Sequence, residues 1–253
     1  MLSAYNTHGE DMVAWEATRA DGPFYCPECH EEVVLKKGTI KEHHFAHLPP
    51  SDCTYGVGES GEHREAKRAI YEALRTHPDV SQVQVERYLG EVRPDISFLA
   101  RDEVEVAVEM QFSPLSPQET ARRTQIYTAK GLHVLWILPS RETLVEGTKY
   151  ATSLLERYLH ALYFGKVYYW VSDDLVVPIH FEKYSLGLIY RDRYDEEEGQ
   201  FQSSYAERFS KRSRIPAFSD VVRIADLQAI TRKAGQFGPY SLPTARLWAQ
   251  ATR

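Results

Sequence analysis

The sequence lacks long uninterrupted hydrophobic runs. No segment approaches the roughly 18 consecutive apolar residues that a membrane-spanning helix needs. The first thirty residues contain no basic stretch followed by an apolar one, which is the pattern of a secretion signal. We therefore expect a cytoplasmic protein with no membrane partner. With 253 residues, of which 43% are hydrophobic, the chain is long enough to bury a sizeable core.

Cysteine is scarce and unevenly placed. Only Cys26, Cys29 and Cys53 occur, and all three lie near the amino-terminal end of the sequence. An odd number of cysteines in a chain without a secretion signal argues against a disulfide framework. It favours metal ligands or free thiols instead.

An excess of positive charge is also missing. The 30 lysines and arginines are outnumbered by 36 aspartates and glutamates, and the formal net charge is −6. This balance argues against a general nucleic-acid coating protein, which needs a basic surface. It does not exclude a nuclease, because a metal site concentrates carboxylates. Residues 122–123 and 211–214 are candidate basic patches, although solvated surface charge is the commoner origin of such runs.

Composition and periodicity divide the chain into three stretches. Residues 1–55 are rich in cysteine, histidine, glycine and proline, and we predict that they form a zinc-binding region. Residues 56–140 alternate helix and strand patterns, and we predict that they form the core domain. Residues 141–253 are predicted to form a carboxy-terminal extension with helical and β-hairpin elements.

The middle stretch has the clearest secondary-structure signals. Ser60 can cap a helix that runs to about residue 75. Strands are predicted over residues 83–89, 92–99 and 104–112, because β-branched and apolar residues alternate there with polar ones. These elements would form the first half of the core.

A second helix and a buried strand complete this core. Ser116 and Glu119 form a capping-box pattern, with Pro117 at the first helical position. The helix should stop before Gly131, and the apolar run at 132–138 is typical of a buried strand. The order of helix, three strands, helix and strand predicts a mixed sheet with helices packed against it.

The amino-terminal stretch contains a candidate zinc site. Zinc takes four cysteine or histidine ligands in a tetrahedron, usually as two pairs brought together by short loops. Cys26 and Cys29 form a CxxC pair. For the second pair we favour His47 and Cys53, with His44 as the main alternative. Reduced cysteines buried beside an unrelated histidine loop are the competing interpretation. Four protein ligands leave no open coordination position, so this zinc would be structural.

Two carboxylates are candidates for a second metal site. Asp95 precedes a predicted strand, and Glu109 lies on the predicted strand at 104–112 with Gln111 on the same face. If the two strands pair in antiparallel fashion, Asp95 can sit beside Glu109. Paired carboxylates suit Mg²⁺ or Mn²⁺, which activates water for phosphodiester hydrolysis. The competing interpretation is a turn residue and a solvated strand residue.

The start of the first predicted helix adds three polar side chains to this site. Glu59 and His63 are four residues apart, as are His63 and Lys67, so all three can share one edge of the helix. Glu59 is a candidate additional metal ligand. His63 and Lys67 are candidates for phosphate contact or proton transfer, although a hydrogen-bonded core histidine is a serious alternative for His63.

The carboxy-terminal stretch is less informative. Residues 154–163 are typical of an amphipathic helix, and residues 167–170 and 175–181 predict a hairpin. Residues 168–170 are aromatic and could stack on bases, but core packing is the commoner role of such side chains. Residues 192–200 resemble a solvated acidic loop.

Several of these motifs together resemble the competence protein CoiA-like family. The resemblance extends from about residue 24 to 140, and the motifs that carry it are CPEC, HHFAHLPPSDC, GESGEHREAKR, RPD and VEMQFSPL. It implies a small zinc-binding region followed by a restriction-endonuclease-like, PD-(D/E)XK nuclease-like α/β domain. It also implies metal binding by Asp95 and Glu109. Gln111 stands where most nucleases of this superfamily place lysine, and the CoiA-like pattern itself has glutamine there.

The sequence therefore predicts a cytoplasmic, Mg²⁺- or Mn²⁺-dependent deoxyribonuclease. Its substrate would be single-stranded or branched DNA, met during DNA uptake, recombination or defence, with recombination proteins as further partners. Gln111 would orient water or phosphate. The alternative is a module of the same fold that binds DNA or a recombinase without cutting, which the missing lysine and the acidic charge keep open.

Overall fold

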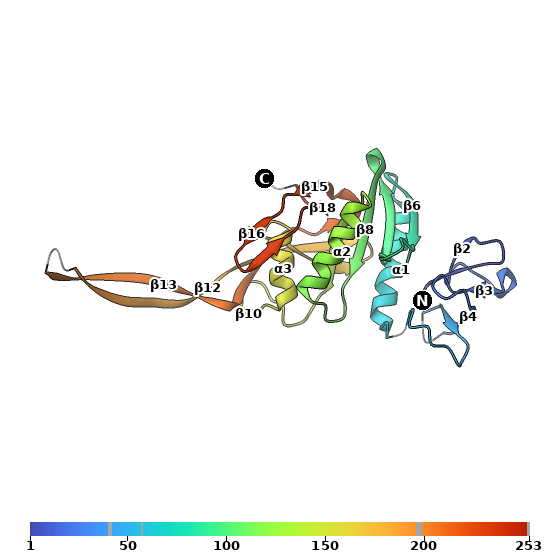
Figure 1. Cartoon of the computed structure of the whole chain (residues 1–253), viewed down its shortest axis with the longest axis horizontal. Coiled ribbons are helices and arrows are strands. Elements are labelled where there is room, and N and C mark those ends of the chain that lie inside the picture. The colour runs from blue at the N-terminus through green and yellow to red at the C-terminus, as the bar shows by residue number, and fades with distance from the viewer. Residues whose placement is uncertain (40–41, 57, 196–198, 252–253) are drawn as a thin grey trace.

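The computed structural model describes residues 1–39, 42–56, 58–195 and 199–251. A central α/β body lies between two smaller parts (Figure 1). A small amino-terminal sheet sits at one side of the body, and a long β-hairpin projects from the other side. None of the described helices is both long and apolar enough to cross a membrane.

The amino-terminal sheet is small and has its own core. Its strands follow the order β2-β1-β3-β4-β5, and each neighbouring pair is antiparallel. Phe24 and Phe45 pack with ring centroids 4.9 Å apart, and Cys26 lies in the same buried cluster. Such a core is small for independent stability, which is the usual reason for a metal staple. The strands are β1 (Ser3–Tyr5), β2 (Asp11–Val13), β3 (Phe24–Tyr25), β4 (Glu32–Lys36) and β5 (His44–His47).

The body is built on one mixed sheet, in the order β10-β13-β12-β11-β9-β8-β7-β6. The pairs β8–β9 and β9–β11 are parallel, and the outer pairs are antiparallel. The predicted mixed α/β sheet is thereby confirmed. The strands are β6 (Val80–Val85), β7 (Ile96–Ala100), β8 (Val104–Met110), β9 (His133–Pro139), β10 (Tyr150–Ala151), β11 (Val167–Ser172), β12 (Leu175–Asp195) and β13 (Gln200–Phe218).

The remaining strands extend this sheet or pair locally. β18 pairs with β9 and β15, β14 pairs with β12, and β16 pairs with β17. Strands after residue 140 thus continue the sheet of the middle stretch. The strands are β14 (Val222–Arg223), β15 (Gln228–Arg232), β16 (Gly235–Phe237), β17 (Tyr240–Leu242) and β18 (Ala245–Ala249).

Three capped helices pack on the sheet: α1 (Gly61–Thr76), α2 (Pro117–Ala129) and α3 (Leu154–Leu162). The hydroxyls of Ser60, Ser116 and Ser153 accept hydrogen bonds from the amides three residues later, which satisfies a free amide in each first turn. α2 and α3 lie side by side (Figure 1). The two predicted helix starts in the middle stretch are confirmed.

Two predicted strands begin and end elsewhere. The strand expected at 83–89 is β6, which ends at Val85, and the strand expected at 92–99 begins at Ile96. Glu86 has a positive φ of 53° and ends the ladder. Asp95 therefore belongs to the connection that enters β7.

The acidic segment at 192–200 is not a simple loop. Residues up to Asp195 continue β12, and β13 starts at Gln200, while residues 196–198 lie outside the described part of the chain. The register pairs Tyr190 with Tyr205 and Tyr194 with Phe201, so aromatic pairs across the ribbon hold its outer half. The prediction of a solvated loop was wrong, because pairing between β12 and β13 continues into this charged segment as far as Asp195 and Gln200.

Candidate functional site

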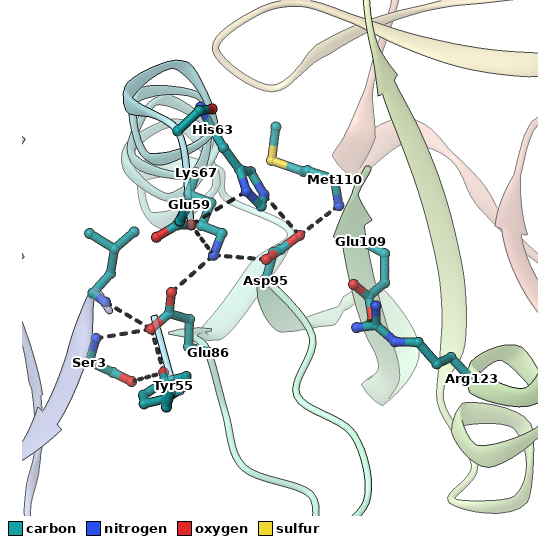
Figure 2. Close-up of polar contacts among 12 residues, drawn as sticks. Ser3, Tyr55, Glu59, His63, Lys67, Glu86, Asp95, Glu109, Met110 and Arg123 are labelled. Carbon is teal, nitrogen blue, oxygen red and sulfur yellow. Dashed lines mark hydrogen bonds and ion pairs between the residues drawn. The ribbon is translucent and has the colours of Figure 1, made fainter. Parts of the chain in front are cut away.

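Lys67 lies at the centre of a buried acidic cluster (Figure 2). Its side chain leaves α1 one turn after His63, and the residue is 4% exposed. The ammonium nitrogen Nζ lies 2.6 Å from Glu59 Oε1, 2.9 Å from Glu86 Oε1 and 2.8 Å from Asp95 Oδ1. One buried cation therefore neutralises part of the charge of three carboxylates.

The electrostatics of this cluster keep Lys67 charged. Burial by itself lowers the pKa of a lysine, but Asp95, Glu86 and Glu59 outweigh burial and raise the pKa of Lys67 well above its usual value. Burial would likewise raise the pKa of Asp95, yet Lys67 and His63 hold that pKa well below its ordinary range. These shifts favour Lys67 as a cation and Asp95 as a carboxylate, although both groups are buried.

Asp95 is fixed by backbone as well as by side chains. Its Oδ2 accepts a hydrogen bond of 2.7 Å from the Met110 backbone amide and lies 3.2 Å from His63 Nε2. The His63 ring stacks on Phe112, with centroids 5.1 Å apart. His63 is therefore a half-buried residue of the cluster and not a member of the apolar core.

Glu109 lies across the sheet from Asp95. The antiparallel register pairs Ile96 with Val108, so Asp95 and Glu109 are the next residues to face each other. Glu109 is 2% exposed and accepts hydrogen bonds from Arg123 and Tyr127 of α2. Both residues thus lie at the same end of the β7–β8 ladder, but the Asp95 carboxylate contacts α1 and the Glu109 carboxylate contacts α2.

The pKa of Glu109 reflects this burial. Desolvation raises the pKa to about 7, although Arg123 lowers it, and the negative charge of Asp95 adds to the rise. A buried carboxyl group with a pKa raised toward neutrality is often found at a functional site. A further cation beside Glu109 would lower this pKa and favour the ionised form.

Glu86 joins the cluster to the amino-terminal region, and sequence reasoning did not identify it. Its Oε2 accepts hydrogen bonds from the Leu2 amide (2.8 Å), the Ser3 amide (3.3 Å) and the Tyr55 hydroxyl. Burial opposes ionisation, but Lys67 lowers the pKa of Glu86 to about 2. The available sequence signal was a charged residue within a predicted half-buried strand.

The other predicted residues occupy different positions. Gln111 Nε2 donates to Ser113 O (2.6 Å) and to Ser113 Oγ (3.0 Å), which directs its amide toward the following loop. Arg123, considered above as part of a surface patch, is instead the half-buried partner of Glu109, whereas Arg122 pairs with Glu119 on the surface. Glu59 Oε2 is buried and has no hydrogen-bond partner among the described residues.

A cavity of about 400 Å³ opens over the Lys67 cluster. It is wide enough for a phosphate group and its neighbours, and it combines polar and aromatic walls. Glu109 is not part of its lining. The lining residues that matter for chemistry are Tyr55, Glu59, His63, Lys67, Glu86, Arg93, Asp95 and Phe112.

The predicted zinc ligands form a compact group. The ligand atoms of Cys26, Cys29, His47 and Cys53 all lie within 4.8 Å of one another. Cys26 Sγ and Cys53 Sγ are 4.0 Å apart, close to the roughly 3.8 Å edge of a tetrahedron with Zn–S bonds of about 2.3 Å. These residues could bind a metal ion, and the geometry is consistent with zinc. His44, the alternative ligand, contacts the Glu42 carbonyl oxygen instead.

Comparison with known proteins matches both parts of the chain to one family. Residues 8–56 match the family model of the competence protein CoiA N-terminal domain, and residues 59–170 match that of the CoiA nuclease-like domain. The competence protein CoiA of Bacillus subtilis (strain 168) is 31% identical over 118 residues, which cover 46% of this chain. The matched segment spans 31% of the length of that relative. No solved structure matches the chain.

Proposed function

Because the chain belongs to the competence protein CoiA-like family, we propose that it is a metal-dependent deoxyribonuclease. The proposed substrate is single-stranded or branched DNA, and the proposed setting is DNA uptake, recombination or defence in the cytoplasm. The observation that carries the proposal is the position of Asp95 and Glu109, each one residue beyond the Ile96–Val108 pair at the end of the β7–β8 ladder, with Asp95 in the wall of a cavity that His63 and Lys67 also line.

The donor set suits a hard divalent cation. Asp95 and Glu109 would hold Mg²⁺ or Mn²⁺, and Glu59 would assist, since its buried Oε2 has no partner among the described residues. Oxygen donors of this kind are those that both ions prefer. Such an ion, when bound, supplies charge stabilisation at the phosphate and lowers the pKa of its bound water.

The remaining side chains have roles that follow from their positions. His63 Nε2 lies 3.2 Å from Asp95 Oδ2 at the wall of the cavity, where it can hold a proton or contact a phosphate oxygen. Lys67 keeps the carboxylates ionised and in place. Gln111 would orient phosphate or water only after its amide leaves Ser113.

Cleavage assays test this proposal directly. We expect Mn²⁺-dependent cleavage of end-labelled single-stranded or branched DNA, and a fall of about 100-fold in rate for Glu109→Gln, as for the loss of one charge-stabilising group in an active site. Glu105→Gln is a matched control, because Glu105 lies on the same strand and pairs with Arg87 outside the cluster. The assignment fails if neither protein cuts, or if wild type and Glu109→Gln cut equally.

The affinity for the divalent ion should depend on pH. Glu109 has a raised pKa of about 7, so below this value it is protonated and must lose a proton before it can act as a ligand. We expect the Mn²⁺ affinity to fall by about tenfold per pH unit below 7 and to level off above it. Titration calorimetry of the zinc-loaded protein between pH 5.5 and 8 measures this. Equal affinities at the two ends, or an unchanged profile in Glu109→Gln, would contradict it.

A second candidate function is a module that binds DNA without cutting it. It is favoured by the pairing of both carboxylates with internal cations, Lys67 for Asp95 and Arg123 for Glu109. In this case wild type and Glu109→Gln would bind DNA equally, and neither would cleave it with Mg²⁺ or Mn²⁺. The same assays therefore separate the two functions.

A further inference from the structure

A second cavity lies at the foot of the long hairpin. It has a volume of about 650 Å³ and is formed by α3, the strands β12 and β13, and the β16–β17 hairpin. Figure 1 places these elements on the opposite side of the body from α1. The side chains that line it and matter here are Arg157, Phe181, Lys211, Arg214, Phe237 and Tyr240.

A β-bulge shapes one wall of this cavity. The β12–β13 register shifts between Lys183, which faces Arg214, and Ser185, which faces Phe209. The extra residues of β13 turn around the Ser210 hydroxyl, which accepts hydrogen bonds from two backbone amides. Bulges re-aim side chains away from the regular alternation of a strand. Here the bulge brings Lys211 and Arg214 to the cavity.

Positive charge at this cavity is not neutralised. Arg157 and Arg214 donate to backbone carbonyl groups, and within the described part of the chain neither they nor Lys211 form an ion pair with a carboxylate. Arg123 and Lys67, by contrast, are fully paired. In a chain with a net charge of −6, three unpaired cations around one cavity favour an anionic ligand.

Aromatic rings lie beside these cations. Phe237 is 42% exposed, and Tyr240 packs edge-on against Tyr158 with centroids 5.8 Å apart, so its ring is held by the core. Accessible aromatic rings next to cations are the combination by which proteins bind single strands, with bases on the rings and phosphates on the cations. The cavity has the size of a nucleotide site and is too small for a duplex.

We propose that this cavity binds a segment of single-stranded DNA, with phosphates on Arg157, Lys211 and Arg214 and a base against Phe237 or Tyr240. The identification of the polymer as DNA rests on the proposed nuclease function. Free nucleotides share the same chemistry, so they form a separate arm of the test. The site would hold a strand away from the Asp95 cavity, with which it shares no lining residue.

Fluorescence anisotropy without added Mg²⁺ or Mn²⁺ tests this site in the zinc-loaded protein. We expect wild type to bind labelled oligo-dT more tightly than dTMP or a blunt duplex. Lys211→Ala and Phe237→Ala should each weaken binding by about tenfold, since each removes a phosphate or a stacking contact. The slope of log affinity against log salt should fall by roughly 0.7 in Lys211→Ala. Lys130→Ala is the matched control, because Lys130 is exposed at the end of α2 and outside the cavity.

Several results would overturn the inference. These are absence of oligo-dT binding, equal or tighter binding of dTMP or duplex, or equal weakening by Lys211→Ala and Lys130→Ala. A change in affinity without a change in salt slope for Lys211→Ala would also count against it, because a merely structural role has that signature. Binding is measured without cleavage, so a protein that binds here but never cuts contradicts only the nuclease proposal. Conversely, cleavage with unaltered binding in Lys211→Ala contradicts only this inference.

Discussion

Replacing Lys67 with methionine is expected to lower the free energy of unfolding by about 3–5 kcal/mol, the usual cost of removing one partner from a buried ionic group. Methionine keeps the unbranched shape and most of the length of the side chain but removes the charge. Glu59, Glu86 and Asp95 would then face one another without the nitrogen that now lies within 2.9 Å of each. Urea denaturation at pH 7 measures the loss, and Lys130→Met, at an exposed lysine, is the matched control.

This destabilisation should depend on pH and on divalent ions. Lys67 holds the pKa values of Glu86 and Asp95 below their usual range, so its contribution to stability is present above those usual values and is lost as pH falls. The difference between the variant and wild type should therefore shrink at pH 4. Millimolar Mn²⁺ should stabilise Lys67→Met more than wild type, since it can replace the missing positive charge. A variant as stable as wild type at pH 7 would contradict the role given to Lys67.

Loss of the zinc ligands is expected to unfold the amino-terminal sheet. The Cys26→Ser variant should lose stoichiometric zinc, and residues 1–55 should become sensitive to protease, because a structural zinc site contributes on the order of 10 kcal/mol to small folds of this kind. The buried cluster around Phe24 and Phe45 is too small to replace that contribution.

His44→Ala is the matched control for this experiment. His44 is the neighbouring histidine on β5, and it contacts the Glu42 carbonyl oxygen and not the ligand group. It should keep its zinc, as measured by metal analysis of the purified protein. Full zinc content in Cys26→Ser, or equal loss in both variants, would refute the assigned ligand set.

The parts of the fold that could be predicted from sequence are those with local causes. Ser60 and Ser116 cap their helices, and strand alternation placed Glu109 on a strand that pairs with the one after Asp95. The grouping of the CxxC pair with His47 and Cys53 could likewise be predicted from the sequence, because zinc geometry restricts the spacing of its ligands. Each of these depends on residues close in sequence.

What could not be predicted depends on contacts distant in sequence. Glu86 accepts hydrogen bonds from the backbone amides of Ser3 and Leu2, which lie 83 and 84 residues before it in the sequence. No local sequence pattern predicts partners this distant. The ion pair of Arg123 with Glu109 depends on how α2 packs on the sheet, and its neighbour Arg122 is an ordinary surface residue. The outer half of the β12–β13 hairpin is polar and charged, so the sequence has no clear strand pattern there. Its pairing becomes evident only in the structure, from cross-strand contacts such as that between Tyr190 and Tyr205.

The hydrogen bonds to Glu86 also bear on how this protein can be recombined with its relatives. Leu2, Ser3 and Tyr55 come from the amino-terminal region, and they hold a carboxylate that belongs to the nuclease-like domain and contacts Lys67. We therefore expect a chimera that joins the first region of one family member to the second domain of another to fold stably only under one condition. The residues at positions 55 and 86 must still be able to form the hydrogen bond that Tyr55 donates to Glu86 here. Although each region has its own core, we expect the two regions to stay together during recombination between relatives.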